Sequence, residues 1–225
     1  MKAIIQKLSP LDEAYQRNAA HFLAEEGWSI PEHCGNPEKE RAQLETGSVL
    51  VDWSHIGKIT LRGNHAEDSA SRLDSRAASL KPQQSCSTDD WAVLRLTGDE
   101  FMILCKSGKE NAILASVEGD DLSILNHGGG LGCLVLGGKG RDEVIERSSA
   151  MNLRRDIVPA GTVVQTSIHM VPCTIFRTSS LEILIHTRDF SESLFDALMD
   201  VGHGVGLIPS GVATLPVSFS TGQED

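Results

Sequence analysis

Two groups of polar residues in this sequence have types and spacing that could do chemistry. Asp52, Ser54 and His55 share one short turn, and Asp89 and Asp90 stand together before an apolar stretch. A nucleophile, a base and an orienting acid normally come from separate elements, so the first group does not make a hydrolase triad. We expect Asp52 and Ser54 to hold the turn instead. Two adjacent acids before a strand are, on their own, more often a solvated strand end than an active site.

Other sequence patterns fail as nucleotide or metal sites. The glycine-rich stretch 127–140 has Val135 where a dinucleotide fingerprint needs its third glycine, and Cys133 and Gly140 break a P-loop. The histidines include no metal-ligand spacing, so we expect no metal site. The five cysteines have no paired spacing, which favours reduced thiols over disulfides or zinc.

The bulk composition excludes several partners. The 225 residues carry a formal net charge of −11 and only 4% aromatic residues, so we expect neither nucleic acid nor an anionic membrane surface as a partner. No apolar run is long enough for a membrane span, and the first residues lack a signal-peptide pattern. The expected location is the cytoplasm.

Helices and strands must position these residues. Apolar spacing after Ser9 predicts a helix that continues through Leu23 to Gly27, and Asn36 starts a second one. Trp91–Leu96 and Glu100–Cys105 predict a hairpin. Further strands are expected at Ala112–Val117, Leu122–Leu125, Leu131–Leu136, Thr162–Ile168, Val171–Phe176 and Leu181–His186.

Helices are also expected over 64–73, over 141–150 and after Asp189. The last of these would begin with a capping box formed by Asp189 and Glu192 and would end at Gly202. Strands and helices do not alternate strictly, so the composition of elements indicates an α+β protein.

The stretch Val51–Gly63 resembles the D-[VW]-S-H-[MI]-G-K-[IV]-x-[VL]-x-G signature of the glycine-cleavage T-protein (aminomethyltransferase) family. Further similar segments follow in the family's order: Gly27–Pro31, Glu40–Gly47, Thr88–Leu94, Leu134–Gly140, Leu181–Ile185 and Gly206–Gly211. The resemblance implies a T-protein-like, tetrahydrofolate-binding (GcvT-type) α+β fold with antiparallel sheets and flanking helices. It covers the family's first two domains and leaves out its C-terminal domain.

The resemblance also implies an interleaved domain organisation. We expect residues 1–62 and 150–215 to form a first folate-type subdomain and residues 63–149 a second. Residues 216–225 are rich in small and polar residues, and we expect a disordered tail.

The second half is similar to the gamma subunit of heterotetrameric sarcosine oxidase. The similarity lies in Pro159–Thr166 and Thr187–Leu194. It implies a larger flavoenzyme or aminomethyl-transfer complex as a protein partner.

Site residues follow from the T-protein resemblance. Asp89 and Asp90 take the position of the Asp near the folate nitrogen that receives the one-carbon unit. The positions implied for tetrahydrofolate contacts are Ile56, Trp91, Val93, Lys106 and Arg177. The sequence departs from the family at several of these positions. Arg177-Thr178 stands where the family has Gly-Glu, Lys106 replaces an Asn, and Leu215–Phe219 lacks an expected Arg.

Three hypotheses about function follow. The first is a binding or partner subunit with an eroded folate site that binds tetrahydrofolate weakly. The second is a minimal aminomethyltransferase in which Asp89 or Asp90 orients the amine and stabilises positive charge while folate N5 attacks the methylene carbon. The third is a non-catalytic scaffold, since fold does not fix function. The loss of folate-holding residues favours the first.

Overall fold

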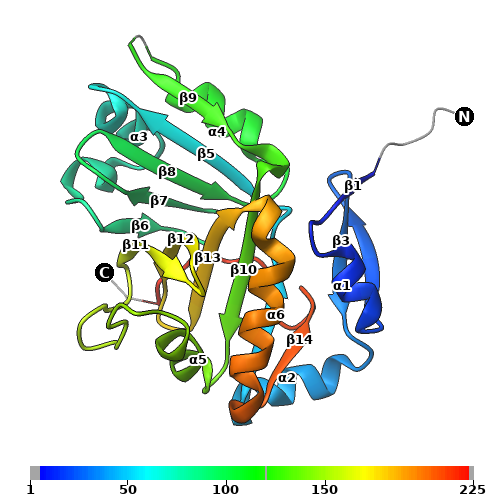
Figure 1. The fold of residues 1–225 in the computed structure, drawn as a ribbon. Helices are drawn as coiled ribbons and strands as arrows, with labels where there is room; N and C mark the ends of the chain where they lie inside the picture. Colours follow the sequence, from blue (N-terminus) through cyan, green and yellow to red (C-terminus); the bar gives the residue numbers. More distant parts are fainter. Residues whose placement is uncertain (1–5, 120, 223–225) are drawn as a thin grey trace, which may run out of the picture.

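Three β-sheets and six α-helices build the protein, and the computed structural model describes residues 6–119 and 121–222 (Figure 1). The six-stranded sheet has the order β11 (Val163–Ile168), β12 (Val171–Arg177), β13 (Leu181–Thr187), β10 (Leu131–Gly137), β4 (Ser48–Asp52), β14 (Leu207–Ser210). The five-stranded sheet has the order β6 (Ser85–Ser87), β7 (Trp91–Arg95), β8 (Glu100–Cys105), β5 (Gly57–Arg62), β9 (Ser123–Asn126). The three-stranded sheet has the order β1 (Lys7–Leu8), β3 (Trp28–His33), β2 (His21–Glu25).

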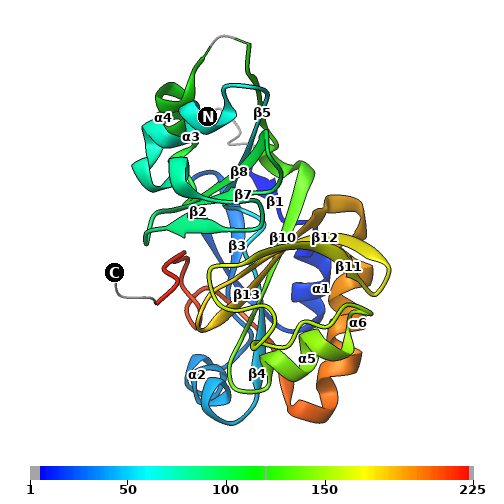
Figure 2. The same cartoon turned by 90° about the vertical axis from the view of Figure 1, so that its left-hand side faces the viewer.

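Most of the helices cover the outer faces of the two larger sheets. They are α1 (Asp12–Arg17), α2 (Pro37–Thr46), α3 (Ala66–Leu73), α4 (Glu110–Val117), α5 (Arg141–Arg147) and α6 (Ser191–Gly202), with short 3-10 turns at Ser75–Ser79, Gly128–Gly130, Arg188–Phe190 and His203–Val205. Figure 2 shows α3 and α4 at one end of the molecule and α5 and α6 at the other. None of the helices within the described ranges is both long and apolar enough to cross a membrane.

Three buried apolar clusters hold these layers together. One lies between the six-stranded sheet and helices α1, α5 and α6, and another lies between the five-stranded sheet and helices α3 and α4. The third lies between the two sheets and contains Trp53, Ile56, Leu104 and Phe176. Successive side chains along these strands therefore pack into two different cores, and this alternation fixes the face of the sheet to which each side chain points.

The expected α+β class, with mainly antiparallel strand pairs and flanking helices, is confirmed. The predicted hairpin appears as β7 and β8, and the apolar stretch after residue 131 is β10, at the centre of the six-stranded sheet. Asn36 caps α2 as expected, because its side-chain oxygen accepts from the backbone N–H groups of Glu38 and Lys39.

Several predicted elements were wrong. The first helix ends at Arg17, because the chain reverses at Ala19 (φ 54°) and residues 21–25 then pair with β3 as β2. The expected strand over 112–117 is helix α4, in which Ile113 and Val117 are buried four residues apart. The helix expected from Arg141 to about Ala150 is present as α5, but it ends three residues earlier, at Arg147.

The predicted capping box does not form. Asp189 lies in a 3-10 turn, and α6 begins only at Ser191 with no side-chain cap among its hydrogen bonds. A 3-10 turn before the helix therefore shifts the helix start past the sequence signal.

The two larger sheets take their strands from different stretches of the chain. The strand β5, at residues 57–62, belongs to the five-stranded sheet with β8 and β9. The strand β10, at residues 131–137, belongs to the six-stranded sheet between β13 and β4. The five-stranded sheet thus takes its strands from residues 57–126.

The C-terminal strap, which we define as residues 211–222, packs on the body of the protein, contrary to the expected disorder. Phe219 is fully buried and meets the ring of Trp53 edge-on, with centroids 6.1 Å apart. The Trp53 Nε1–H donates to the Leu215 carbonyl at 3.0 Å, and the Ser179 N–H donates to the Thr221 carbonyl at 3.1 Å. Residues 223–225 of the expected tail lie outside the described residues.

Candidate functional site

Asp90 and Lys106 are brought together by the β7–β8 hairpin. Trp91 is in register with Cys105, so the residue before β7 meets the residue after β8. Lys106 Nζ lies 3.0 Å from Asp90 Oδ1, and Lys109 Nζ lies 3.0 Å from Asp90 Oδ2. Hydrogen bonds from both ammonium groups hold the pKa of Asp90 below its usual value. Each oxygen of this carboxylate therefore has a cationic partner.

Asp89 points to the C-terminal strap. Its side chain is exposed, and Oδ1 accepts a hydrogen bond from the Ser218 hydroxyl at 2.9 Å. The two adjacent acids thus have different partners: Asp90 is paired with lysines and Asp89 is tied to the strap.

A small cavity of about 190 Å³ lies beside this pair of acids. Its walls come from the turn after β4, from the loop after β8 and from the strap; the lining residues are Glu25, His55, Lys106, Ser107, Val212, Pro216 and Val217. We call it the strap cavity. Sequence reasoning identified only Lys106 of this set as a site residue. The other residues come from loops that meet only in the folded chain.

The turn after β4 forms the floor of this region and is held by polar contacts. Asp52 Oδ1 accepts from the Ser54 N–H at 2.8 Å, and Ser54 Oγ accepts from the Cys133 N–H at 3.0 Å. The turn-holding roles expected for Asp52 and Ser54 are therefore confirmed. Burial raises the pKa of Asp52.

Two buried basic side chains follow in the same segment. Lys58 Nζ donates to the carbonyls of Ser54 and Ile56, each at 2.8 Å, and burial lowers the pKa of this ammonium. Burial and the charge of Lys58 lower the pKa of His55 to about 4, so its imidazole is neutral at pH 7. These side chains support the turn from inside the protein.

The remaining expected folate contacts do not gather at the strap cavity. Val93 is fully buried in the helix-side core, and Trp91 packs against the same core. This follows from strand alternation, because both residues lie on the face of β7 opposite to the inter-sheet core. Ile56 is buried in the inter-sheet core.

Arg177 belongs to a separate ion pair in the six-stranded sheet. It is in register with Glu182 across β12 and β13, and Nε lies 2.7 Å from Glu182 Oε1. Arg177 Nη1 also donates to the carbonyls of Leu153 and Val158 at 2.7 and 2.6 Å. Both side chains of the pair are fully or almost fully buried. Arg177 therefore anchors the loop before β11.

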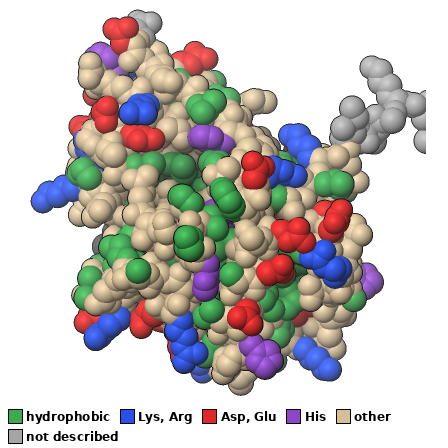
Figure 3. All heavy atoms as spheres, in the orientation of Figure 1, with side chains coloured by type: hydrophobic (Ala, Val, Ile, Leu, Met, Phe, Trp, Pro, Cys, Tyr) green, Lys and Arg blue, Asp and Glu red, His purple; other side chains and the backbone are tan. Residues whose placement is uncertain are grey.

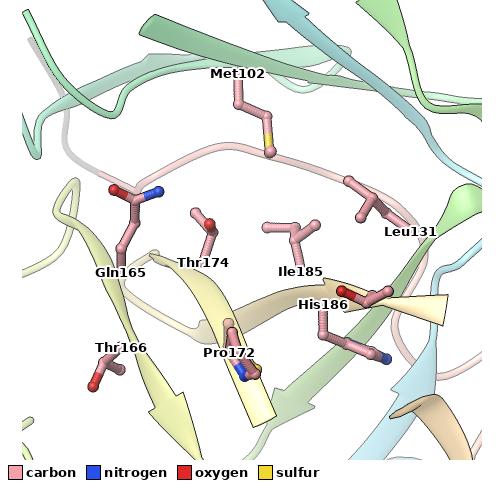
Figure 4. A pocket seen from close by; sticks show the side chains of 10 residues that line it. Met102, Leu131, Gln165, Thr166, Pro172, Thr174, Ile185 and His186 are labelled. Atoms are coloured by element: carbon pink, nitrogen blue, oxygen red, sulfur yellow. The ribbon is translucent and has the colours of Figure 1, made fainter. Parts of the chain in front are cut away.

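A larger cavity of about 380 Å³ opens between the two sheets (Figure 4). Met102 enters it from β8, and Gln165, Thr174 and Ile185 face it from β11, β12 and β13. None of the site residues expected from the sequence lines this cavity. Among the described residues, no group of three His, Cys, Asp or Glu side chains could hold a metal ion, and the five cysteines are free thiols.

Comparisons with known proteins agree with the architecture. A family model described as the GCVT N-terminal domain matches residues 11–218. An aminomethyltransferase of Desulfitobacterium hafniense (strain DSM 10664 / DCB-2) is 21% identical over 226 residues, covering 92% of this chain and 61% of that protein. An aminomethyltransferase of Halothermothrix orenii is 24% identical and is covered to 62%. The chain thus spans about three fifths of the length of the curated relatives it matches.

Solved structures show the same fold. The glycine cleavage system aminomethyltransferase T of Bartonella henselae superposes with a TM-score of 0.78 at 21% identity, over 92% of this chain and 60% of that one. A chain of heterotetrameric sarcosine oxidase from Corynebacterium sp. U-96 superposes with a TM-score of 0.64 at 15% identity, over 88% of this chain and 95% of that one.

Proposed function

Because the chain belongs to the family of GCVT N-terminal domains, we propose that it is an accessory subunit of an aminomethyl-transferring or amine-oxidising complex. In this role the chain keeps the folate-type fold but lacks several of the residues that would carry out one-carbon transfer. A larger protein partner supplies the chemistry. The likeness in fold to nearly the whole of one sarcosine oxidase chain supports a role as a subunit.

The observation that carries this proposal is that both carboxylate oxygens of Asp90 are already paired with lysines. A carboxylate that orients an amine must offer an oxygen to that amine and stabilise its positive charge. Here both oxygens are held by Lys106 and Lys109, each at 3.0 Å. One carboxylate and two ammonium groups leave a local charge of about +1, which disfavours a cationic amine at this position.

The strap cavity does not fit a whole tetrahydrofolate molecule. Sites for ligands of this size have volumes of about 300–1,000 Å³, whereas this cavity has about 190 Å³. The strap walls it with Val212, Pro216 and Val217. The family resemblance implied that Arg177 contacts the folate, but its guanidinium is paired with the buried Glu182 carboxylate. The residues present therefore do not fit a site for one-carbon transfer to tetrahydrofolate, and we expect tetrahydrofolate to bind only weakly.

Calorimetric titration with tetrahydrofolate tests the proposal. We expect a dissociation constant of about 1 mM or weaker, which corresponds to about 4 kcal/mol of binding free energy. Asp90→Ala should leave this dissociation constant unchanged. Asp99→Ala, which removes an acid from the exposed hairpin turn, is the control and should leave it unchanged too. No methylene transfer to tetrahydrofolate should occur when the purified protein is mixed with an aminomethyl donor.

The hypothesis of a minimal aminomethyltransferase predicts the opposite result. Micromolar binding that weakens about tenfold or more in Asp90→Ala or Asp89→Ala, but not in Asp99→Ala, would replace the accessory role with an enzyme. Weak folate binding together with no stable complex with any amine-oxidising or aminomethyl-transferring protein would leave the scaffold hypothesis.

A further inference from the structure

A charged cleft of about 200 Å³ separates the three-stranded sheet from the five-stranded sheet and its helix α4. Lys7, Glu26 and Trp28 line it from the three-stranded side, and Glu110 and Asn126 line it from the opposite side. Its floor is buried, since Trp28 is 4% exposed and His55 is 2% exposed. Figure 3 shows acidic and basic side chains interspersed over the region of the three-stranded sheet.

The ammonium of Lys7 and the carboxylate of Glu110 lie on opposite sides of this cleft. Lys7 Nζ stands over the ring of Trp28, 5.4 Å from its centroid. Glu110 lies across the cleft in the first turn of α4, where its side chain covers Gly57; a Cβ at Gly57 would lie 2.6 Å from Glu110 Cγ. Among the described residues, neither Lys7 nor Glu110 forms an ion pair. Both charges therefore remain available to a ligand.

Glu26 adds a second carboxylate from the turn before β3. It reaches toward the loop before α4, since a Cβ at Gly108 would lie 2.9 Å from Glu26 Cδ. Glu26 likewise has no ion-pair partner among the described residues. The cleft therefore has two carboxylates near the α4 loop and one ammonium at the Trp28 ring.

His55 supplies an independent sign of a ligand. This almost fully buried side chain lines the cleft, and within residues 6–119 and 121–222 its Nδ1 has no hydrogen-bond partner. Buried polar atoms are rarely left without a partner, and each exception calls for a physical explanation. A small polar molecule on the floor of the cleft is such an explanation.

We propose that this cleft binds a small zwitterion of the α-amino acid class, with its carboxylate at Lys7 and its ammonium at Glu110 and Glu26. The two carboxylates repel a simple anion, and a simple cation would leave the Lys7 ammonium without an anionic partner, whereas a zwitterion pairs with both kinds of group. The small volume limits the ligand to one with a short side chain. The Trp28 ring is a flat apolar wall against which methyl or methylene groups pack. The cleft shares His55 with the strap cavity, but the charged residues proposed to bind the zwitterion, Lys7, Glu26 and Glu110, do not line that cavity.

Calorimetry at pH 7 with glycine as the probe tests the proposal, with acetate and methylamine as its two halves. We expect glycine to bind at least about tenfold more tightly than either half. Lys7→Gln and Glu110→Gln should each weaken glycine binding by about tenfold or more. Glu118→Gln, at the other end of α4, is the matched control and should leave it unchanged.

NMR spectroscopy shows whether glycine binds in the cleft itself and not elsewhere on the protein. Glycine should shift the ring resonances of His55, and the shift should be lost in Lys7→Gln and Glu110→Gln. Glycine binding no tighter than that of acetate and methylamine would overturn the proposal, as would an absence of binding at about 10 mM, which is weaker than about 3 kcal/mol. An equal loss in Glu118→Gln would overturn it too, because the effect would then not come from the cleft.

Discussion

Phe219 fixes the C-terminal strap between the two sheets, and we expect Phe219→Ala to lower the free energy of unfolding substantially. The ring is fully buried in the inter-sheet core and meets Trp53 with an interplanar angle of 80°. Truncating a buried phenylalanine costs about 3–5 kcal/mol, because contacts are lost and a cavity remains. The edge-to-face contact with Trp53 contributes roughly 0.5–1.5 kcal/mol of this loss.

Urea unfolding followed by circular dichroism measures this effect. The transition midpoint should fall while the dependence on urea concentration stays the same, because the change lies in stability and not in the surface exposed. In thermal unfolding, a loss of about 3–5 kcal/mol corresponds to roughly 6–20 °C for a chain of this size. Phe190→Ala is the matched control, because Phe190 is 47% exposed, and its effect should stay within about 0.5 kcal/mol.

Equal effects in the two phenylalanine variants would refute this reasoning. If Phe219→Ala costs less than about 1 kcal/mol, the strap does not fill the space between the sheets. The limited size of the strap cavity would then lose its explanation, and the argument against folate binding would weaken.

Three further predictions concern the six-stranded sheet. Gly132→Ala should cost about 1–3 kcal/mol in urea unfolding, because the new Cβ would lie 2.5 Å from His186 Nε2, whereas Gly130→Ala meets no heavy atom within 4 Å and should be nearly neutral. Arg177→Met should cost about 3–5 kcal/mol in the same assay, because the Glu182 carboxylate stays buried without its closest partner. Burial lowers the pKa of His186 to about 4, so its contribution to stability is present above about pH 6.5 and is lost as the pH falls toward 4. Between pH 7 and pH 5 the stability of His186→Asn should therefore fall by about 2 kcal/mol less than that of the unsubstituted protein.

Each of these predictions has a contrary result. Equal stability of the two glycine variants would mean that the sheet relaxes around an added methyl group. A neutral Arg177→Met would mean that Arg155, whose Nη2 lies 3.1 Å from Glu182 Oε1, compensates the buried carboxylate alone. An unchanged pH dependence in His186→Asn would mean that other groups cause the acid destabilisation.

The elements that were predictable from sequence are those with strong local signals. The β7–β8 hairpin has a turn signal between two apolar runs, and β10 is a continuous apolar run between glycines. Residues 21–25 and 112–117 lacked such signals, because short apolar stretches suit a helix or a strand equally well. Their conformations are set by tertiary pairing with β3 and by packing on the five-stranded sheet.

The candidate site was predictable only in part. Asp90 and Lys106 lie at the two ends of one hairpin, so their proximity follows from its register. Lys109 takes part because the chain turns before α4, and no signal in the sequence gives the direction of its side chain. Arg177 was placed by resemblance alone, and its actual partner, Glu182, is five residues away and opposite to it in the β12–β13 register. A family position therefore does not fix a side chain's contacts.

The order of strands in the six-stranded sheet has a consequence for how the chain folds. The five-stranded sheet takes all its strands from residues 57–126 and can form as soon as that stretch has been synthesised. The strand β4 pairs with β10 on one side and with β14, at residues 207–210, on the other. One edge of β4 can pair with β10 once residue 137 has been synthesised, but the other edge, at residues 49–51, stays unpaired until more than 150 further residues have emerged. Closing this long loop makes the β4–β14 pairing a late step in folding, and we expect the unpaired edge of β4 to be open to misassociation until then.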